Sequence, residues 1–429
     1  MVKPVFNINS SMKTSRRHFI KIGGYTIAAS GIVPAVLNSC TPPEKKIIFD
    51  NELEGIEPLG SEDYIDRLEK LKRSITRYEI DAIFIEGPTN LKYFFNISWW
   101  LSERIFGAVV NTSGNPVWIC PAFELERASE QVPEGHEIRT WEEHESPYKL
   151  FMEIIRDRGL SGRKVAMGPN VRSFLSQSIR RELPAEILDG SMAVNMVRAI
   201  KTEKEIGYMD VANRITKKAY RYAFENLSEG MTKNEIADNI SFAHAEMGTS
   251  GRGGPLIGFT SAFPHGTRQV RDLHDGDIIL VDGGCSVEGF RSDVTRTIVY
   301  GTPTDRQKEV FNVVLEAQQA AHNAIKPGVE CGEIDRVARK VVSDAGFGPG
   351  YKYFAHRLGH GIGMDGHEFP YLVKDNKLLM EPGMTFSNEP GIYIYGEFGV
   401  RIEDCFVVTG TGARMLGGML TASIDKPFS

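Results

Sequence analysis

Residues 356–367, HRLGHGIGMDGH, place three of the chain's ten histidines and four glycines within twelve positions. His356 and His360 are four residues apart, the spacing that puts two histidines on one face of a zinc-binding helix. Each glycine, however, costs a helix interior about 1 kcal/mol relative to alanine, so a helix here is unfavourable. Closely spaced glycines instead indicate backbone that bends, adopts a positive φ, or approaches another group closely. The alternative is a flexible surface loop whose histidines are incidental.

Composition narrows the class of protein. The chain has 429 residues, of which 41% are hydrophobic and 25% charged, and its formal net charge is −6. This is globular composition, with length for two or three domains. No basic stripe with interleaved aromatic residues is present, so no nucleic-acid partner is expected.

The first forty residues differ from the rest. Arg16-Arg17 is followed by an apolar run over residues 22–37, which is shorter than the roughly 20 apolar residues of a membrane span. The run suits a secretory signal, and a lipobox-like tetrapeptide ends at Cys40. We expect residues 1–40 to be a twin-arginine export signal and 41–59 a tether, giving a periplasmic or membrane-anchored lipoprotein with a lipid on Cys40. The alternative is a disordered tail with a chance arginine pair.

The other cysteines carry no metal or redox motif. None of Cys120, Cys285, Cys331 and Cys405 lies in a CxxC arrangement. Cys120, Cys285 and Cys405 lie in apolar, strand-like stretches and are expected to be buried thiols. If the chain is exported to an oxidising compartment, a disulfide between two cysteines is the alternative.

Residues 60–194 alternate between helical and extended patterns, which indicates an α/β domain. Helical spacing places Ile65, Leu68 and Leu71 on one face. Turn residues at 111–116 separate two strand-like runs and predict a hairpin.

Residues 195–429 indicate an α+β domain. Helices are predicted over residues 200–226, 304–325 and 333–345. Strands are predicted over residues 277–282 and 295–300.

Several carboxylates of this second domain lie in apolar or glycine-flanked strand contexts. Asp282 is near the end of a predicted strand, and Asp293 follows eleven residues later, so a hairpin would bring the two together. Glu389 and Glu403 lie in similar contexts, and His360 adds an imidazole. Taken singly, each acid is read more simply as a hydrogen-bonded turn residue, but five such positions in one domain weaken that reading.

Converging carboxylates repel one another and raise their own pKa values unless a cation joins them. Oxygen-rich ligands with one histidine favour Mn²⁺, Fe²⁺ or Co²⁺ over a thiolate zinc site. Two such ions about 3.5–4 Å apart can generate hydroxide at neutral pH and polarise a carbonyl. The pattern therefore suggests a dinuclear hydrolase.

The motifs VDGG, SDVTRT, HRLGHGIG, NEPGIY and VRIED, in this order, resemble the pita-bread metallopeptidases. This family includes Xaa-Pro aminopeptidase, prolidase and methionine aminopeptidase, with creatinase as a non-metal relative. Residues 60–194 resemble their creatinase-like N-terminal domain, which methionine aminopeptidases lack. The resemblance implies an Xaa-Pro aminopeptidase that uses a dinuclear-metal-activated hydroxide, with a prolidase acting on Xaa-Pro dipeptides as the alternative. It also implies a homodimer, and two divalent ions that we expect to be Mn²⁺, with Co²⁺, Fe²⁺ or Zn²⁺ as alternatives.

The resemblance also assigns roles by position. The implied metal ligands are Asp282, Asp293, His360, Glu389 and Glu403. Among the catalytic residues, Glu389 is the implied proton acceptor, His265 binds substrate, His356 and His367 orient substrate and stabilise the oxyanion, and Arg401 pairs with a carboxylate. Tyr393, Trp99 and Trp100 are candidates for a proline pocket, with core or dimer packing as the alternative for the tryptophans.

Two other classes of function remain open. A non-peptidase hydrolase or lyase on the same fold would use a similar centre, although a creatinase-like enzyme would lack the metal ligands. A binding module that has lost catalysis is disfavoured because all five ligands and the histidines are present.

Overall fold

The computed structural model describes residues 49–182 and 187–429. The predicted export signal, Cys40 and residues 41–48 of the predicted tether lie outside the described residues. Within the described ranges, no helix combines the length and the apolar character that crossing a bilayer requires.

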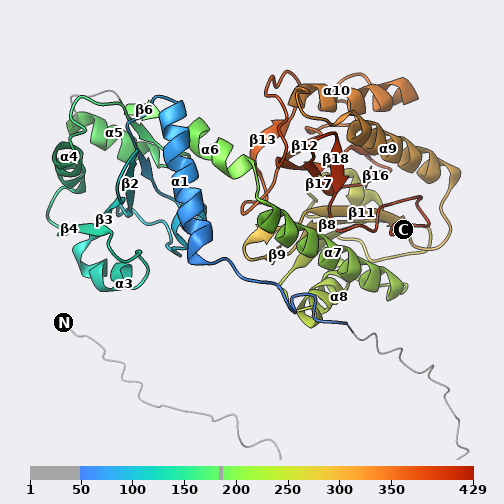
Figure 1. Cartoon of the computed structure of the whole chain (residues 1–429). Helices are drawn as coiled ribbons and strands as arrows, with labels where there is room; N and C mark the ends of the chain where they lie inside the picture. Colours follow the sequence, from blue (N-terminus) through green and yellow to red (C-terminus); the bar gives the residue numbers. More distant parts are fainter. Residues whose placement is uncertain (1–48, 183–186) are drawn as a thin grey trace, which may run out of the picture. The chain divides into compact units, whose positions relative to one another are not determined.

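The N-terminal half is an α/β unit built on a mixed six-stranded sheet (Figure 1). The strand order is β4-β3-β2-β1-β5-β6, in which β1–β2 and β2–β3 are antiparallel and the other neighbours are parallel. Its strands are β1 (Ala82–Ile85), β2 (Gly107–Asn111), β3 (Val117–Pro121), β4 (Glu137–Trp141), β5 (Val165–Met167) and β6 (Ile187–Asp189). Its helices are α1 (Ser61–Arg77), α2 (Pro88–Phe95), α3 (Leu125–Ser129), α4 (Pro147–Asp157), α5 (Ser173–Glu182) and α6 (Ser191–Ala199). The predicted hairpin is confirmed as β2–β3.

The predicted apolar face of α1 is wrong in one respect. Leu71 is buried, but Ile65 is 54% exposed and Arg67 is buried in its place. The Arg67 guanidinium forms an ion pair with Glu205 at 2.7 Å and lies over the Tyr93 ring. A paired and stacked arginine can occupy a position that hydrophobic spacing alone assigns to an aliphatic side chain.

The C-terminal half is α+β, as predicted, and its strands form two larger sheets and two ribbons. The sheets have the orders β11-β8-β7 and β13-β12-β14-β17-β18, and the ribbons are β9–β10 and β15–β16. The strands are β7 (Arg252–Ile257), β8 (Ile278–Gly284), β9 (Ser286–Val287), β10 (Phe290–Arg291), β11 (Val294–Val299), β12 (Gly359–Gly361), β13 (Glu368–Leu372), β14 (Thr385–Asn388), β15 (Gly391–Ile394), β16 (Phe398–Arg401), β17 (Asp404–Val408) and β18 (Ala413–Met415). The helices are α7 (Glu203–Glu225), α8 (Lys233–Glu246), α9 (Asp305–Ala324) and α10 (Cys331–Val342).

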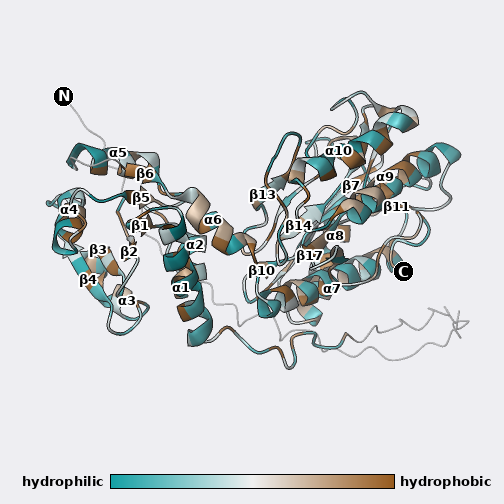
Figure 2. Cartoon of the chain, turned by 45° about the horizontal axis from the view of Figure 1, so that its top comes forward, coloured by the Kyte–Doolittle hydropathy of each residue, from teal (hydrophilic) through white to brown (hydrophobic). Residues whose placement is uncertain are grey.

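Three long helices of this half begin at threonine N-caps, which can be recognised in the sequence. Thr202, Thr232 and Thr304 each accept a hydrogen bond from the backbone N–H three residues later. The helix predicted to end at residue 345 instead ends at Val342, and a single π-helical turn follows that contains Gly346 at φ 87°. Figure 2 shows hydrophilic and hydrophobic residues along α9 and α10, as expected for helices with one buried face.

The glycines of residues 356–367 serve close packing between strands. At Gly359, an added Cβ would lie 2.1 Å from the Ser387 carbonyl oxygen on the neighbouring strand β14. At Gly361 it would lie 2.6 Å from the Phe369 backbone on β13. Neither glycine has a positive φ. Residues 359–361 of this stretch therefore form a strand, β12, between β13 and β14, and the helical and loop readings are both wrong for His360.

The four described cysteines, Cys120, Cys285, Cys331 and Cys405, are buried free thiols. This confirms the burial predicted for three of them.

Candidate metal centre

The structure brings the five predicted ligands together from both C-terminal sheets. Asp282 lies in β8, Asp293 directly precedes β11, His360 lies in β12, Glu389 directly follows β14, and Glu403 joins β16 to β17. The antiparallel pairing of β8 with β11 sets Asp282 opposite Thr295. In the sequence, the ribbon β9–β10 comes between these two paired strands, so the predicted hairpin carries an insertion.

The ligand atoms form three overlapping clusters. Within each cluster they lie within 4.8 Å of one another. The clusters are Asp282, Asp293 and Glu403; His360, Glu389 and Glu403; and Asp293, His360 and His367. His360 Nε2 lies 3.2 Å from Glu389 Oε1 and 3.7 Å from Asp293 Oδ2. Asp293, His360 and Glu403 each belong to two clusters, and of these three the two carboxylates have a second oxygen with which to bridge two ions.

Thr295 contacts two of the candidate ligands, and its role was not predicted from the sequence. Its backbone pairs with Glu403 in an isolated β-bridge. Its Oγ1 lies 3.0 Å from Asp282 Oδ1 and 2.7 Å from Glu403 Oε2, each within hydrogen-bonding distance. Only its place in the strand after Asp293 hinted at such a position.

Arg401 and Tyr393 form a second buried hydrogen-bond network. Arg401 Nη2 lies 2.8 Å from Asp282 Oδ2, the ion pair that the sequence analysis expected. Arg401 Nη1 donates to the Tyr393 hydroxyl at 2.8 Å, and that hydroxyl lies 2.8 Å from His356 Nε2. Burial raises the pKa of Tyr393 to about 12 against the opposing effect of Arg401, so the phenol stays protonated. Tyr393 was expected to line a pocket; its hydroxyl instead links Arg401 to His356.

The three predicted substrate histidines lie in different surroundings. The His367 ring stacks on that of His360 at 3.7 Å between centroids. His356 is half-buried, whereas His265 and His367 are exposed, and His265 lines a cavity together with Asp282 and Arg401. Burial lowers the pKa values of both His356 and His367, which keeps the two imidazoles neutral.

The pKa values of the acidic groups in the centre are shifted in opposite directions. Burial and the neighbouring Asp282 carboxylate raise the pKa of Asp293 well above its ordinary value. Burial and Asp293 raise the pKa of Glu403 in the same way. Burial opposes ionisation of Glu389 too, but the hydrogen bond from His360 and the nearby positive charges together outweigh it and lower the pKa of Glu389 to about 2.

These residues fit divalent cations. Four carboxylates and one imidazole converge in a largely buried site, and on their own two of the acids are driven toward protonation. Ions that replace those protons remove the repulsion. The oxygen-rich donor set suits hard or borderline divalent metals.

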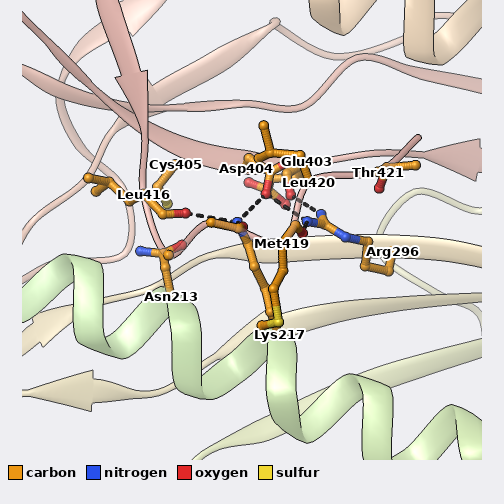
Figure 3. A network of polar contacts seen from close by, with 12 residues as sticks. Asn213, Lys217, Arg296, Glu403, Asp404, Cys405, Leu416, Met419, Leu420 and Thr421 are labelled. Carbon is orange, nitrogen blue, oxygen red and sulfur yellow. Dashed lines mark hydrogen bonds and ion pairs between the residues drawn. The ribbon is translucent and has the colours of Figure 1, made fainter. Parts of the chain in front are cut away.

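A buried charged network supports the strand that carries Glu403 (Figure 3). Lys217 from α7 and Arg296 from β11 converge on one carboxylate oxygen of Asp404, each at 2.7 Å. Arg296 also donates to the Glu403 carbonyl oxygen at 2.8 Å. Burial opposes ionisation of Asp404, but Arg296 and Lys217 lower its pKa, so the acid is charged. Sequence patterns gave no sign of this network, because an isolated lysine in a helix is normally read as a solvated residue.

The two candidate tryptophans, Trp99 and Trp100, differ in their surroundings. Trp99 stacks on Phe106 at 3.8 Å between centroids, under the Arg127 guanidinium. Trp100 is 70% exposed. The packing reading therefore describes Trp99, and the role of Trp100 stays a prediction.

A cavity of about 630 Å³ opens beside the centre. Asp282, Arg401 and His265 line one part of it, and β7 and the first turn of α8 line another. Its volume lies within the range of about 300–1,000 Å³ that is typical of small-ligand sites.

Two family models match this chain. The metallopeptidase family M24 matches residues 207–410, and the creatinase/prolidase N-terminal domain matches residues 67–200. The first match contains all six residues of the three clusters, and the second covers most of the six-stranded sheet and its helices.

Known proteins similar to the chain include both dipeptidases and an aminopeptidase. An Xaa-Pro dipeptidase of Lactobacillus helveticus is 36% identical over 354 residues, which is 81% of this chain and 95% of the relative. The crystal structure of a dipeptidase from Mycobacterium ulcerans has a TM-score of 0.78 and 30% identity, covering 84% of this chain and 96% of that one. An X-Pro aminopeptidase structure from Thermotoga maritima has a TM-score of 0.69 and 27% identity, covering 81% and 96%.

Proposed function

The chain belongs to metallopeptidase family M24, and from that premise we propose that it hydrolyses the bond between an N-terminal residue and a following proline. It is a hydrolase with a pita-bread catalytic domain behind a creatinase-type N-terminal domain. The convergence of Asp282, Asp293, His360, Glu389 and Glu403 is the observation that carries the proposal.

These five residues would hold two divalent ions, which we propose to be Mn²⁺. Asp293 and Glu403 would bridge them, since each belongs to two of the clusters and each carboxylate has two oxygens with which to bind. When bound, such ions supply an activated water at neutral pH and polarise the scissile carbonyl.

The chain's own groups position and protonate the reactants. Glu389, with its pKa lowered to about 2, is ionised at neutral pH and can accept the proton of the attacking water. His367 stacks on His360, so its imidazole has a fixed place from which to donate to the developing oxyanion. The neutral His356 ring donates from Nδ1 to the Arg357 carbonyl oxygen and accepts at Nε2 from the Tyr393 hydroxyl, so its part is to hold Tyr393 and Arg401 in position. Arg401 holds Asp282 in position, and His265 lies in the cavity where substrate would enter.

Proline at the second position needs a dedicated site. The Xaa-Pro bond is a tertiary amide without an N–H, so a peptidase that requires that donor cannot bind it productively. In this chain the groups facing the cavity include His265 and the side chain of Leu256, which offer an imidazole and an apolar wall in place of an N–H acceptor.

The length of the substrate distinguishes two forms of this activity. Our leading form is an aminopeptidase that releases the first residue from longer peptides. A prolidase restricted to Xaa-Pro dipeptides is the second form, and it is favoured by the relatives from Lactobacillus helveticus and Lactobacillus delbrueckii, both named Xaa-Pro dipeptidase.

Mass spectrometry on the Mn²⁺-loaded full chain tests the proposal. The substrates are an equal mixture of an Xaa-Pro dipeptide, Xaa-Pro-Yaa tripeptides and matched peptides without proline. Release of the first residue from the tripeptides supports the aminopeptidase, and cleavage of the dipeptide alone supports the prolidase. No cleavage with both ions bound contradicts the proposal and favours a non-peptidase hydrolase or lyase on this fold.

We further propose export and dimerisation. Arg16-Arg17, the apolar run after it and Cys40 support a lipid-anchored, periplasmic protein, and the family resemblance supports a homodimer. Metabolic labelling with a fatty acid tests the anchor, because a Cys40→Ser chain should incorporate none. Light scattering tests the dimer, since a monomeric mass would contradict it.

A further inference from the structure

Besides Arg401, three basic residues line the cavity beside the metal centre. They are Arg252 on β7, Lys233 at the start of α8, and Arg268 in the loop that follows His265. The register of β7 against β8 places Gly254 opposite Asp282. Arg252 is two residues from Gly254, so it lies on the same face of the sheet as the Asp282 carboxylate.

These cations have no anionic partner within the parts of the chain that the structure describes. No ion pair or side-chain hydrogen bond joins Lys233, Arg252 or Arg268 to another described residue. Asp282 is the one acid among the described residues that line the cavity, and Arg401 already pairs with it at 2.8 Å.

Three unpaired cations around one cavity repel one another in a chain whose net charge is −6. Lys233 is also at the N-terminus of a helix, where the backbone dipole disfavours a cation. An anion in the cavity would relieve both costs. A wall of one charge sign also concentrates ligands of the opposite sign.

We infer that this part of the cavity binds a carboxylate of the peptide substrate through Arg252, with Lys233 and Arg268 adding to its positive field. The inference rests on the proposed Xaa-Pro hydrolysis and specifies its substrate class. Two sources offer the same chemistry: the C-terminal carboxylate of an Xaa-Pro dipeptide, and the side chain of an acidic first residue. An arginine guanidinium binds either through paired N–H donors.

Four peptides separate the two sources. Ala-Pro and its C-terminal amide differ only in the terminal charge, and the amides of Glu-Pro and Gln-Pro differ only in the side-chain charge. The measurement is kcat/KM for each peptide with the Mn²⁺-loaded full chain, with Arg252→Gln and Arg268→Gln variants, and with Arg73→Gln as control. Arg73 is an exposed arginine on α1 and does not line the cavity.

A charged peptide of one pair should be cleaved about tenfold faster than its neutral partner by the wild type, as expected for one lost charge-assisted contact. That preference should shrink to about twofold in Arg252→Gln, remain in Arg73→Gln, and weaken as salt is added. Preference within the Ala-Pro pair identifies the terminal carboxylate, and preference within the Glu-Pro pair identifies the acidic side chain.

Two results overturn the inference alone. One is equal cleavage of charged and neutral peptides by the wild type. The other is an equal loss on all four peptides in both variants, which would mark these arginines as structural. Absence of any turnover by the wild type instead overturns the proposed function, and this inference with it.

Discussion

The Lys217 ammonium lies 2.7 Å from the Asp404 carboxylate, and both side chains are fully buried. Lys217 also donates to the carbonyl oxygens of Leu416 and Gly418, at 2.8 and 2.6 Å. Asp404 is the residue after Glu403. Lys217 therefore joins the first residue of β17, directly after a candidate metal ligand, to the backbone of residues 416–418 (Figure 3).

Lys217→Met should destabilise the protein strongly, because it leaves Asp404 with Arg296 as its one ion-pair partner in the described chain. Removal of one partner of a buried pair costs about 3–5 kcal/mol in the free energy of unfolding. Urea unfolding of the metal-free chain measures it, and Mn²⁺ affinity should fall as well because the strand that begins at Asp404 loosens.

The matched control is Lys70→Met, which breaks a surface pair with Asp66 four residues earlier. Exposed pairs of this kind contribute about 0–1 kcal/mol. Equal losses in the two variants would show that the buried pair has no special structural weight.

Tyr393→Phe should lower kcat about 10–100-fold while the metal content stays unchanged. The change removes the hydroxyl that joins Arg401 to His356 and leaves the ring in place. Steady-state kinetics with metal analysis by mass spectrometry measures both quantities. Tyr395→Phe is the control, because Tyr395 is 68% exposed and should tolerate the change. If Tyr393→Phe were as active as the control, the hydrogen bonds of the Tyr393 hydroxyl would not contribute to catalysis.

His367→Ala decides between two roles for that residue. We predict a substantial fall in kcat with both ions retained, because His367 is exposed and stacks on His360. Its ring nitrogen, however, lies within 4.8 Å of ligand atoms of Asp293 and His360. Loss of one ion in His367→Ala, with none lost in a His144→Ala control at an exposed position, would make it a metal ligand.

The five candidate ligands could be predicted from the sequence, whereas most of the residues that support them could not. Asp282 and Asp293 were predictable as neighbours because strand pairing follows from two apolar runs and a turn. Arg67 at a core-facing position, Lys217 in its buried pair and Thr295 between two acids were not. Each depends on a partner more than one hundred residues away, and local periodicity carries no information about such partners. The close approach of another group to Gly359 could be predicted from the clustered glycines, but the identity of that group, Ser387, could not.

Acid should weaken the attachment of the first described residues to α7. Burial opposes ionisation of Glu52, but hydrogen bonds from Lys218 and Arg214 outweigh it and lower its pKa. A lowered folded-state pKa contributes stability above the unfolded value of about 4.3, which is lost as pH falls through the folded value. The wild type should therefore melt about 1–2 °C above Glu52→Gln at pH 7, and this difference should shrink as pH falls below the unfolded value. Differential scanning fluorimetry across this range measures it, and a difference that persists or grows in acid would contradict the assignment.

The most direct test of the central claim is a titration of metal-free full chain with Mn²⁺. Bound metal per chain and hydrolysis of an Xaa-Pro peptide are followed together, for the wild type and for Asp293→Asn. We predict that activity rises as two ions bind, and that Asp293→Asn, which has lost a bridging carboxylate, binds fewer ions and shows no turnover. Full turnover by the metal-free wild type, or by Asp293→Asn, would contradict a dinuclear centre built from these five residues.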